Sequence, residues 1–143
     1  MTKWSHPFVL LAALGCAPYR QPVHAPNAPK PIAPYSPAIV AGDFVFVSGQ
    51  GPVDPVTQKY TPSDIKSETK LTLENIKAIL EAAGSSLDKV VKCNVYLIDM
   101  KHFPAMNEVY GTYFKSPAPA RATVQVAALP LGIQIEIECV ARR

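Results

Sequence analysis

The sequence predicts an α+β domain in which a mixed β-sheet carries two helices on one face. Two segments, at about 61–83 and 101–114, show the 3.6-residue apolar periodicity of amphipathic helices. The segments around them alternate apolar and polar residues or are rich in β-branched ones, as strands are. The order of elements is β-β-(β)-α-β-α-β-β, which is not a strict βαβ repeat. A length of 143 residues suits a single domain of this kind.

The first strands are expected to form a β-hairpin. Apolar runs at 39–40 and 44–47 flank a short turn that contains Gly42. The next four residues, 48–51, are Ser-Gly-Gln-Gly, with a glycine on each side of a polar residue. This pattern indicates a bulge or a sharp bend where the backbone becomes accessible.

The first helix is predicted to begin with Thr61 as its N-cap and Pro62 as its first residue, and to end at Ala83 before Gly84. Its apolar stripe comprises Ile65, Thr69, Leu73, Ile76, Leu80 and Ala83. Its solvated face is expected to carry Glu68, Lys70, Glu74, Lys77 and Glu81. The helix should therefore pack on the sheet along one side only.

The second half of the domain continues with a strand, a helix and two further strands. A β-branched run predicts a strand at 90–98, and Asp99 can cap a helix at about 101–114. The aromatic stripe of this helix, interpreted as core, comprises Phe103, Met106, Tyr110 and Tyr113. Strands at about 121–128 and 133–141 are most simply joined as a hairpin through the segment 129–132.

The N-terminal residues differ in composition from the domain, since more than half of the 15 prolines lie before residue 38. Residues 1–16 combine a basic start, a short apolar run and a cysteine. This combination predicts a secretory signal, or a lipoprotein signal with Cys16 as the lipidated residue. The alternative is an extension without meaning. Residues 17–31 read as a proline-rich tether with nothing to bury, which leaves 32–143 as the domain.

The composition argues against several partners. The net charge is only +3 and the basic residues are scattered, which disfavours nucleic-acid binding. No cluster of Cys and His has metal-ligand spacing, so no metal is expected. The N-terminal apolar run is too short to span a bilayer, which leaves a lipid anchor as the only membrane contact. A functional signal would make the protein periplasmic or lipid-anchored, and without one it is cytoplasmic.

Cys93 and Cys139 each lie inside an apolar, strand-like run. We interpret them as two small buried hydrophobic residues. A disulfide would suit an exported protein, although the spacing does not argue for one.

An arginine and a glutamate fall within the last two strands. In an antiparallel pair of strands, Arg121 and Glu136 can lie on the same face and near one another. One interpretation is a cross-strand ion pair on a solvated sheet face, worth roughly 0–1 kcal/mol. The other is a pocket, where the guanidinium grips a carboxylate and the glutamate holds a water or exchanges a proton. Spacing alone leaves both open.

The chain carries a series of separated motifs between about residues 30 and 143. They are Ile32-Ala33-Pro34-Tyr35-Ser36, Val47-Ser48-Gly49-Gln50, the segments 75–84 and 103–110, Pro119-Ala120-Arg121-Ala122-Thr123-Val124, Leu129-Pro130, and Ile135-Glu136-Ile137-Glu138. Together, and in this order, they resemble the reactive-intermediate deaminase (Rid, YjgF-like) family. The arginine motif with the downstream glutamate pair is the most specific marker.

The resemblance implies a chorismate-mutase-like fold and a homotrimer with three sites in clefts between subunits. It implies hydrolysis of reactive 2-imino and enamine acids, such as 2-iminopropanoate and 2-iminobutanoate, to 2-oxo acids and ammonia, without metal or cofactor. Such imines form when pyridoxal-phosphate enzymes eliminate from serine or threonine, so the role would be metabolite damage control. By position, Arg121 matches the arginine that binds the substrate carboxylate, and Glu136 the acid that positions or activates water. The other matching pocket residues are Tyr35, Ser48, Gly49, Asn107 and Thr123.

Two positions depart from the family pattern. Thr123 stands where a deaminase subgroup often has cysteine, and Ala33 where glycine is usual. Thr123 bears on the range of substrates and not on binding. One alternative function, which export would favour, is a trimer that binds small carboxylate or carbonyl metabolites without turnover. Another is the ribonuclease activity reported for some relatives, for which the sequence offers no basic patch.

Overall fold

A computed structural model describes residues 19–143 of the chain. The predicted signal at 1–16, with Cys16, lies outside the described residues and stays a prediction. Among residues 19–143, no helix is both long and apolar enough to cross a bilayer.

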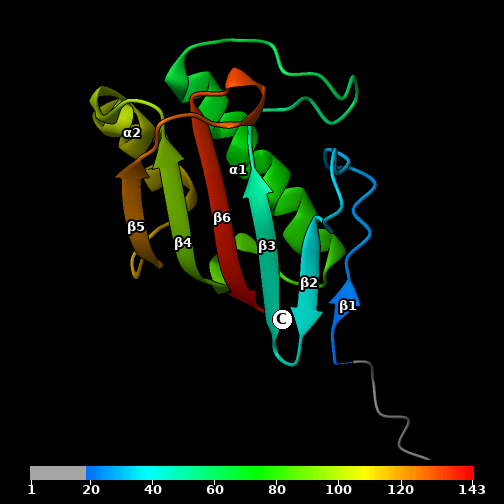
Figure 1. Ribbon diagram of the computed structural model, residues 1–143. Coiled ribbons are helices and arrows are strands. Elements are labelled where there is room, and N and C mark those ends of the chain that lie inside the picture. Colours follow the sequence, from blue (N-terminus) through cyan, green and yellow to red (C-terminus); the bar gives the residue numbers. More distant parts are fainter. Residues whose placement is uncertain (1–18) are drawn as a thin grey trace, which may run out of the picture.

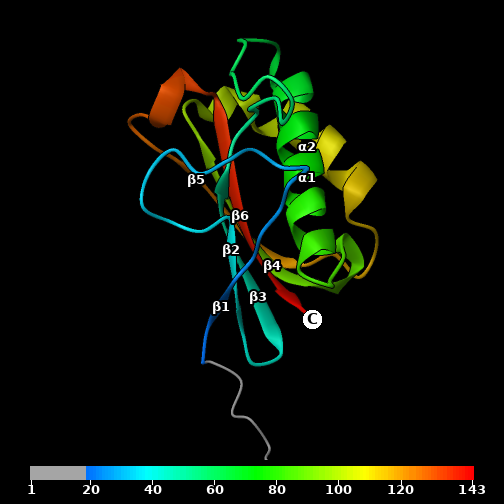
Figure 2. The same ribbon diagram turned by 90° about the vertical axis from the view of Figure 1, so that its right-hand side faces the viewer.

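One six-stranded sheet organises the molecule, in the order β1-β2-β3-β6-β4-β5 (Figure 1). The strands are β1 (Gln21–Pro22), β2 (Ala38–Ala41), β3 (Phe44–Gln50), β4 (Val90–Leu97), β5 (Ala120–Gln125) and β6 (Ile135–Arg142). All neighbours are antiparallel except β4 and β5, which are parallel. The helices α1 (Ile65–Ala82) and α2 (Phe103–Tyr113) both cover the same face of the sheet (Figure 2). The predicted mixed sheet with two helices on one face is confirmed.

Helix α1 supplies most of the layer that covers the sheet. All six residues of its predicted apolar stripe are buried. Each large aliphatic side chain among them contributes about 1.5–3 kcal/mol by its burial. The predicted start at Thr61 is wrong, because the Asp64 carboxylate accepts from the backbone N–H groups of Lys66 and Ser67 and caps the helix three residues later. The end was placed correctly, since Gly84 follows the last turn with a φ of 75°.

Glu68 is fully buried, although the sequence placed it on the solvated face of α1. Its carboxylate accepts hydrogen bonds from the Tyr60 hydroxyl at 2.7 Å and from the backbone N–H and side-chain amide of Gln134 at 3.0 and 2.9 Å. The backbone N–H of Ser63 is a further donor at 3.3 Å. These donors make burial of the charge tolerable, and they tie α1 to the residue just before β6.

The hairpin of β2 and β3 was predicted correctly. Gly42 occupies its turn with a φ of 56°. The pairing of β3 with β6 shifts register between Val47 and Gln50, so the predicted bulge in the stretch 48–51 is also present.

The predicted hairpin between the last two strands is wrong. Strand β4 lies between β5 and β6 and pairs with both. The chain that leaves β5 crosses the end of β4, where Val126 N–H donates to the Leu97 carbonyl and Ile98 N–H donates to the Gln134 carbonyl. A short 3₁₀ turn at Pro130–Gly132 lies within this crossing in place of a tight hairpin turn.

Part of the predicted tether belongs to the fold. Strand β1 pairs with β2, and Val23 and Ala28 are buried in the core. The expectation that residues 17–31 bury nothing is therefore wrong, and the folded domain starts ahead of residue 32.

Cys93 and Cys139 face each other on β4 and β6, with their Cα atoms 4.2 Å apart. Both are buried beneath the helices, as predicted. A disulfide joins them, which was the alternative that their spacing did not favour.

Candidate functional site

A pocket of about 1080 Å³ opens beside β3 and β6. Four of the predicted site residues line it: Tyr35, Ser48, Gly49 and Glu136. Glu136 pairs with Tyr96 of β4 and lies on the sheet face that the helices leave uncovered, as does Glu138. Apolar side chains, among them Ile32, Val53, Leu131 and Ile133, form much of the remaining wall.

Hydrogen bonds from the interior hold the backbone of this pocket. The Gln50 side-chain amide donates to the carbonyls of Ser48 and Gly49, both at 3.1 Å. The Asn75 amide donates to the carbonyls of Gly51 and Val53, at 3.0 and 2.9 Å. The Ser48 hydroxyl donates to the Ser36 carbonyl at 2.7 Å. The bulged segment is therefore fixed from α1 and from the preceding loop, which preorganises the pocket wall.

Glycine at position 49 permits a close approach of the Glu136 side chain. A Cβ atom added there would overlap Oε1 of Glu136. The Glu136 carboxylate thus lies directly against the backbone of Gly49, where a side chain would displace it.

The electrostatics of the two pocket carboxylates differ. Burial raises the pKa of Glu136, and the negative charge of Glu138 raises it further. Glu138 accepts hydrogen bonds from the Asn94 amide at 2.7 Å and the Tyr96 hydroxyl at 2.9 Å. Glu136 accepts no hydrogen bond among residues 19–143, so it is the carboxyl of the two that is free to exchange a proton.

Arg121 occupies a different place. It pairs with Cys93 on β4, so its side chain lies on the face covered by the helices. The guanidinium carbon lies 4.5 Å from the ring centroid of Tyr110 and 5.6 Å from that of Phe103. Both rings belong to α2, and Asn107 lies on the same side of that helix by its spacing of three and four residues from them.

Three polar groups near β5 lack partners. Among residues 19–143, the Arg121 guanidinium has no hydrogen bond or ion pair, and the buried hydroxyls of Thr123 and Tyr110 have none. Burial raises the pKa of Tyr110, and the charge of Arg121 opposes that shift. The unpaired guanidinium of half-buried Arg121 can bind an anion that offers two acceptor oxygens.

The structure thus divides the predicted site in two. Tyr35, Ser48, Gly49 and Glu136 lie together in the pocket, whereas Asn107, Arg121 and Thr123 gather around β5 and α2. The prediction that Arg121 and Glu136 form a same-face pair on adjacent strands is wrong. Their strands are separated by β4, about 10 Å apart across the sheet, and their side chains lie on opposite faces. A single chain does not bring the two groups together.

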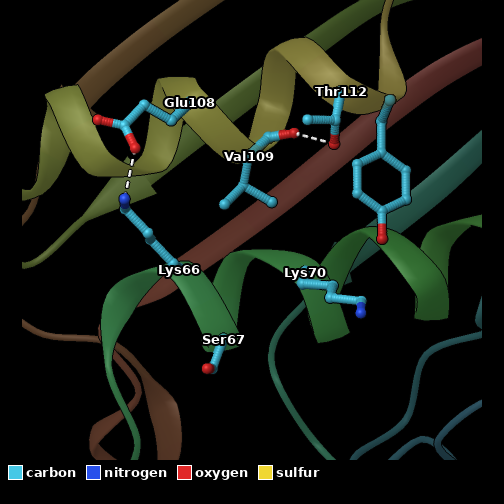
Figure 3. Close-up of a pocket in the computed structure, with 7 residues that line it drawn as sticks. Lys66, Ser67, Lys70, Glu108, Val109 and Thr112 are labelled. Atoms are coloured by element: carbon cyan, nitrogen blue, oxygen red, sulfur yellow. Dashed lines mark hydrogen bonds and ion pairs between the residues drawn. The ribbon is translucent and has the colours of Figure 1, made fainter.

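A second hollow, of about 540 Å³, lies between α1 and α2 (Figure 3). Lys66 and Glu108 form an ion pair across it, and none of the predicted site residues lines it. We regard it as a helix–helix groove and not as a candidate site. In the part of the chain that the structure describes, no group of three or more His, Cys, Asp or Glu side chains is arranged to hold a metal ion.

The sequence did not single out Glu138, Tyr110 or Phe103 as site residues. Glu138 could have been found, because it lies two residues after Glu136 and alternation puts both on one face. Tyr110 and Phe103 were interpreted as core, since an aromatic stripe on a helix gives no sign that an arginine will lie over it.

Comparison with known proteins identifies the family. A family model described as Endoribonuclease L-PSP matches residues 25–143. A RutC family protein of Pyrococcus horikoshii is 54% identical over 122 residues, which cover 85% of this chain and 97% of that protein. Reactive Intermediate Deaminase A, chloroplastic, of Arabidopsis thaliana is 40% identical over 141 residues, or 99% of this chain and 75% of that protein.

The fold is shared with solved structures. The crystal structure of E. coli TdcF with bound serine superposes with a TM-score of 0.81 at 40% identity, covering 86% of this chain and 98% of that one. The match to the family model includes every predicted pocket residue. The chain therefore belongs to the Rid (YjgF) family.

Proposed function

We propose that the protein hydrolyses 2-imino acids, such as 2-iminopropanoate and 2-iminobutanoate, to 2-oxo acids and ammonia. The observation that carries the proposal is the presence of two complementary half-sites in one chain. One half-site is the pocket that contains the carboxylate of Glu136, which can exchange a proton. The other is the unpaired guanidinium of Arg121, which lies over two aromatic rings. Membership of a family that includes a protein named Reactive Intermediate Deaminase A supports this activity.

The proposal includes assembly of three copies, with the Arg121 half-site of one copy placed against the Glu136 pocket of the next. The sheet face that carries Glu136 also exposes Phe44 and Phe46, and β5 exposes Val124 on the same side. Large apolar side chains that gather on an uncovered sheet face favour burial against a partner. A closed ring of identical copies would complete every site in the same way.

In the proposed site, Arg121 binds the substrate carboxylate through two parallel charge-assisted hydrogen bonds. Glu136 holds a water molecule and accepts its proton as the water oxygen attacks C2 of the imine. The proton passes to the substrate nitrogen, which gives a carbinolamine. Glu136 then moves the hydroxyl proton of this intermediate to the same nitrogen, the C–N bond breaks and ammonia leaves, while the C–O bond becomes the carbonyl. Both water protons thus end on nitrogen. Positioned acid–base help of this kind accelerates a reaction by roughly 10²–10⁴-fold.

The direct test is an assay with a serine dehydratase, which releases 2-aminoacrylate in solution. Pyruvate formation is followed with and without the protein, and the spontaneous rate is subtracted. We expect acceleration in proportion to the protein added. Equal rates of pyruvate formation with and without the protein would refute the deaminase assignment.

A second candidate is a metabolite-binding trimer without turnover. The structure of TdcF with bound serine shows that one relative holds an amino acid, and it supports this candidate. Calorimetric titration with 2-oxobutanoate separates the two, because a pure binder would saturate without accelerating imine hydrolysis. We do not assign RNA cleavage, since Glu136 and Glu138 line the pocket and their charge opposes a phosphate backbone.

A further inference from the structure

Glu138 lines the same pocket as Glu136, yet the proposed reaction gives it no role. The two residues are separated by one position on β6, so their side chains leave the same face about 7 Å apart along the strand. A second carboxylate so close to a catalytic one is unfavourable for the fold unless it is held by donors.

The donors that hold Glu138 come from the neighbouring strand, β4. Asn94 lies directly opposite Glu138 and donates its amide at 2.7 Å. Tyr96 lies opposite Glu136, but its hydroxyl reaches Glu138 at 2.9 Å. That hydrogen bond raises the pKa of Tyr96, so the phenol remains protonated and remains a donor. These two donors hold the Glu138 carboxylate in a fixed position beside Glu136.

Glu136 is held differently. Among the described residues it accepts no hydrogen bond, and it lies against the backbone of Gly49. The pair is therefore asymmetric, with one carboxylate fixed and the other free to exchange protons. Pairs of acids whose environments differ in this way take different roles in proton transfer.

We propose that Glu138 is a positioning residue that acts through Glu136: its fixed negative charge makes Glu136 a stronger proton acceptor during imine hydrolysis. Asn94 and Tyr96 keep that charge in place. The pKa of Glu136 is raised, first by burial and second by the charge of Glu138, which agrees with this effect. The catalytic part of this inference rests on the proposed function, whereas the electrostatic coupling does not.

Other groups near Glu136 do not supply the same effect. On β3, the Ser48 hydroxyl donates to the Ser36 carbonyl. Just before β6, the Gln134 side-chain amide donates to Glu68 and to the Ser63 carbonyl. The far walls of the pocket carry the ionisable side chains of Lys30, Tyr35, Lys59 and Tyr60. In the proposed trimer, Arg121 of the partner subunit would add a positive charge, which lowers the pKa of Glu136. The carboxylate of the bound substrate offsets that charge.

The test is a titration of the assembled protein with ¹³C label at the glutamate carboxyl carbons, followed by NMR. The Glu136 resonance is assigned by its loss in Glu136→Gln. We expect its midpoint to move to lower pH in Glu138→Gln, and to stay close to the original in Glu138→Asp, which keeps the charge. The matched control is Glu74→Gln on α1, which removes a carboxylate that also accepts from a tyrosine hydroxyl, that of Tyr113, on the other face of the sheet. This control should leave the midpoint unchanged.

The same variants are then assayed for imine hydrolysis across pH. The acidic limb of kcat/KM should shift to lower pH in Glu138→Gln, with a fall in kcat and little change in KM. An unchanged Glu136 midpoint in a folded Glu138→Gln protein would overturn the inference, as would an equal shift in the Glu74→Gln control. If Glu138→Gln does not fold, Glu138→Ala decides, because it also removes the charge: a Glu136 midpoint equal to that of the wild type contradicts the coupling. If Glu138 shifts the Glu136 midpoint but the protein does not accelerate imine hydrolysis, the deaminase function is refuted and the electrostatic coupling stands.

Discussion

The two faces of the sheet carry the two halves of the site in different ways. On the covered face, Arg121 lies over rings of α2 at the edge of a closed apolar layer, and its position follows from packing within one chain. On the uncovered face, Glu136 lies in an open pocket whose wall is a bulged segment held by hydrogen bonds. In the proposed function, one half-site binds the substrate, the other performs proton transfer, and neither is complete alone. A substitution in one half-site should therefore leave the other intact.

The largest effect is expected from Glu136→Gln, which keeps the size of the side chain but removes its ability to accept a proton. We expect kcat to fall by about 10³-fold, within the range for loss of acid–base help. KM should change little, because the carboxylate-binding half-site is untouched. Steady-state kinetics with the coupled dehydratase assay measure both. A large rise in KM with kcat preserved would show that Glu136 binds the substrate instead.

Arg121→Ala should act on binding. Two charge-assisted hydrogen bonds, each worth about 1.5–3 kcal/mol, are lost, so kcat/KM should fall by at least about 10²-fold, mainly through KM. Arg142→Ala is the matched control, since this exposed arginine ends β6 far from the pocket. Full activity of Arg121→Ala would show that the half-site around α2 is structural only.

Gly49→Ala should displace the carboxylate without unfolding the chain. The added Cβ overlaps the flexible end of the Glu136 side chain, which can move. We expect activity to fall roughly tenfold through misplacement of the catalytic group, with little change in thermal stability. The control is Gly111→Ala in α2, where a Cβ meets nothing within 4 Å. That variant should retain activity and gain about 0.5–1 kcal/mol of stability. Equal activity losses in both variants would contradict the close approach.

The smallest effect at neutral pH is expected from protonation of Glu136, which sets the acidic limb of the pH–rate profile. Glu136 must be ionised to accept a proton, and its folded-state pKa is raised, first by burial. Activity should therefore decline as the pH falls through a midpoint above 4.5, the ordinary value for the group, and remain flat near pH 7–8. Glu136→Gln should show no such limb after subtraction of the spontaneous rate. A limb retained in that variant would assign the titration to another group.

Local patterns were enough to predict the helices, the first hairpin and the bulge at Gly49. Periodicity reports which side of an element is buried, and glycine positions report turns and bulges. The position of β5 was not predictable in this way, because the partner of an edge strand depends on contacts between residues far apart in sequence. The burial of Glu68 depended likewise on donors from Tyr60 and Gln134, which only the tertiary structure brings together.

The candidate site was likewise only partly predictable from the sequence. Family resemblance identified the residues by type and order, and the structure gathers them into two clusters. Alternation correctly put Glu136 and Glu138 on one face of β6. It could not relate that face to the face of Arg121, because relating two strands requires knowing which strands pair and in which direction.

The central claim is that one active site draws Glu136 from one copy and Arg121 from another. The most direct test mixes the two impaired variants, Arg121→Ala and Glu136→Gln, by unfolding them together, refolding at equal amounts and assaying with substrate below the wild-type KM. If sites are shared between neighbouring copies in a ring, random assembly restores about one quarter of the wild-type activity per site. At that substrate concentration, each variant refolded alone should show about 1% of the wild-type rate or less. If the mixture shows no higher rate than the single variants although mass spectrometry shows mixed assemblies, both residues act within the same copy and the account is wrong.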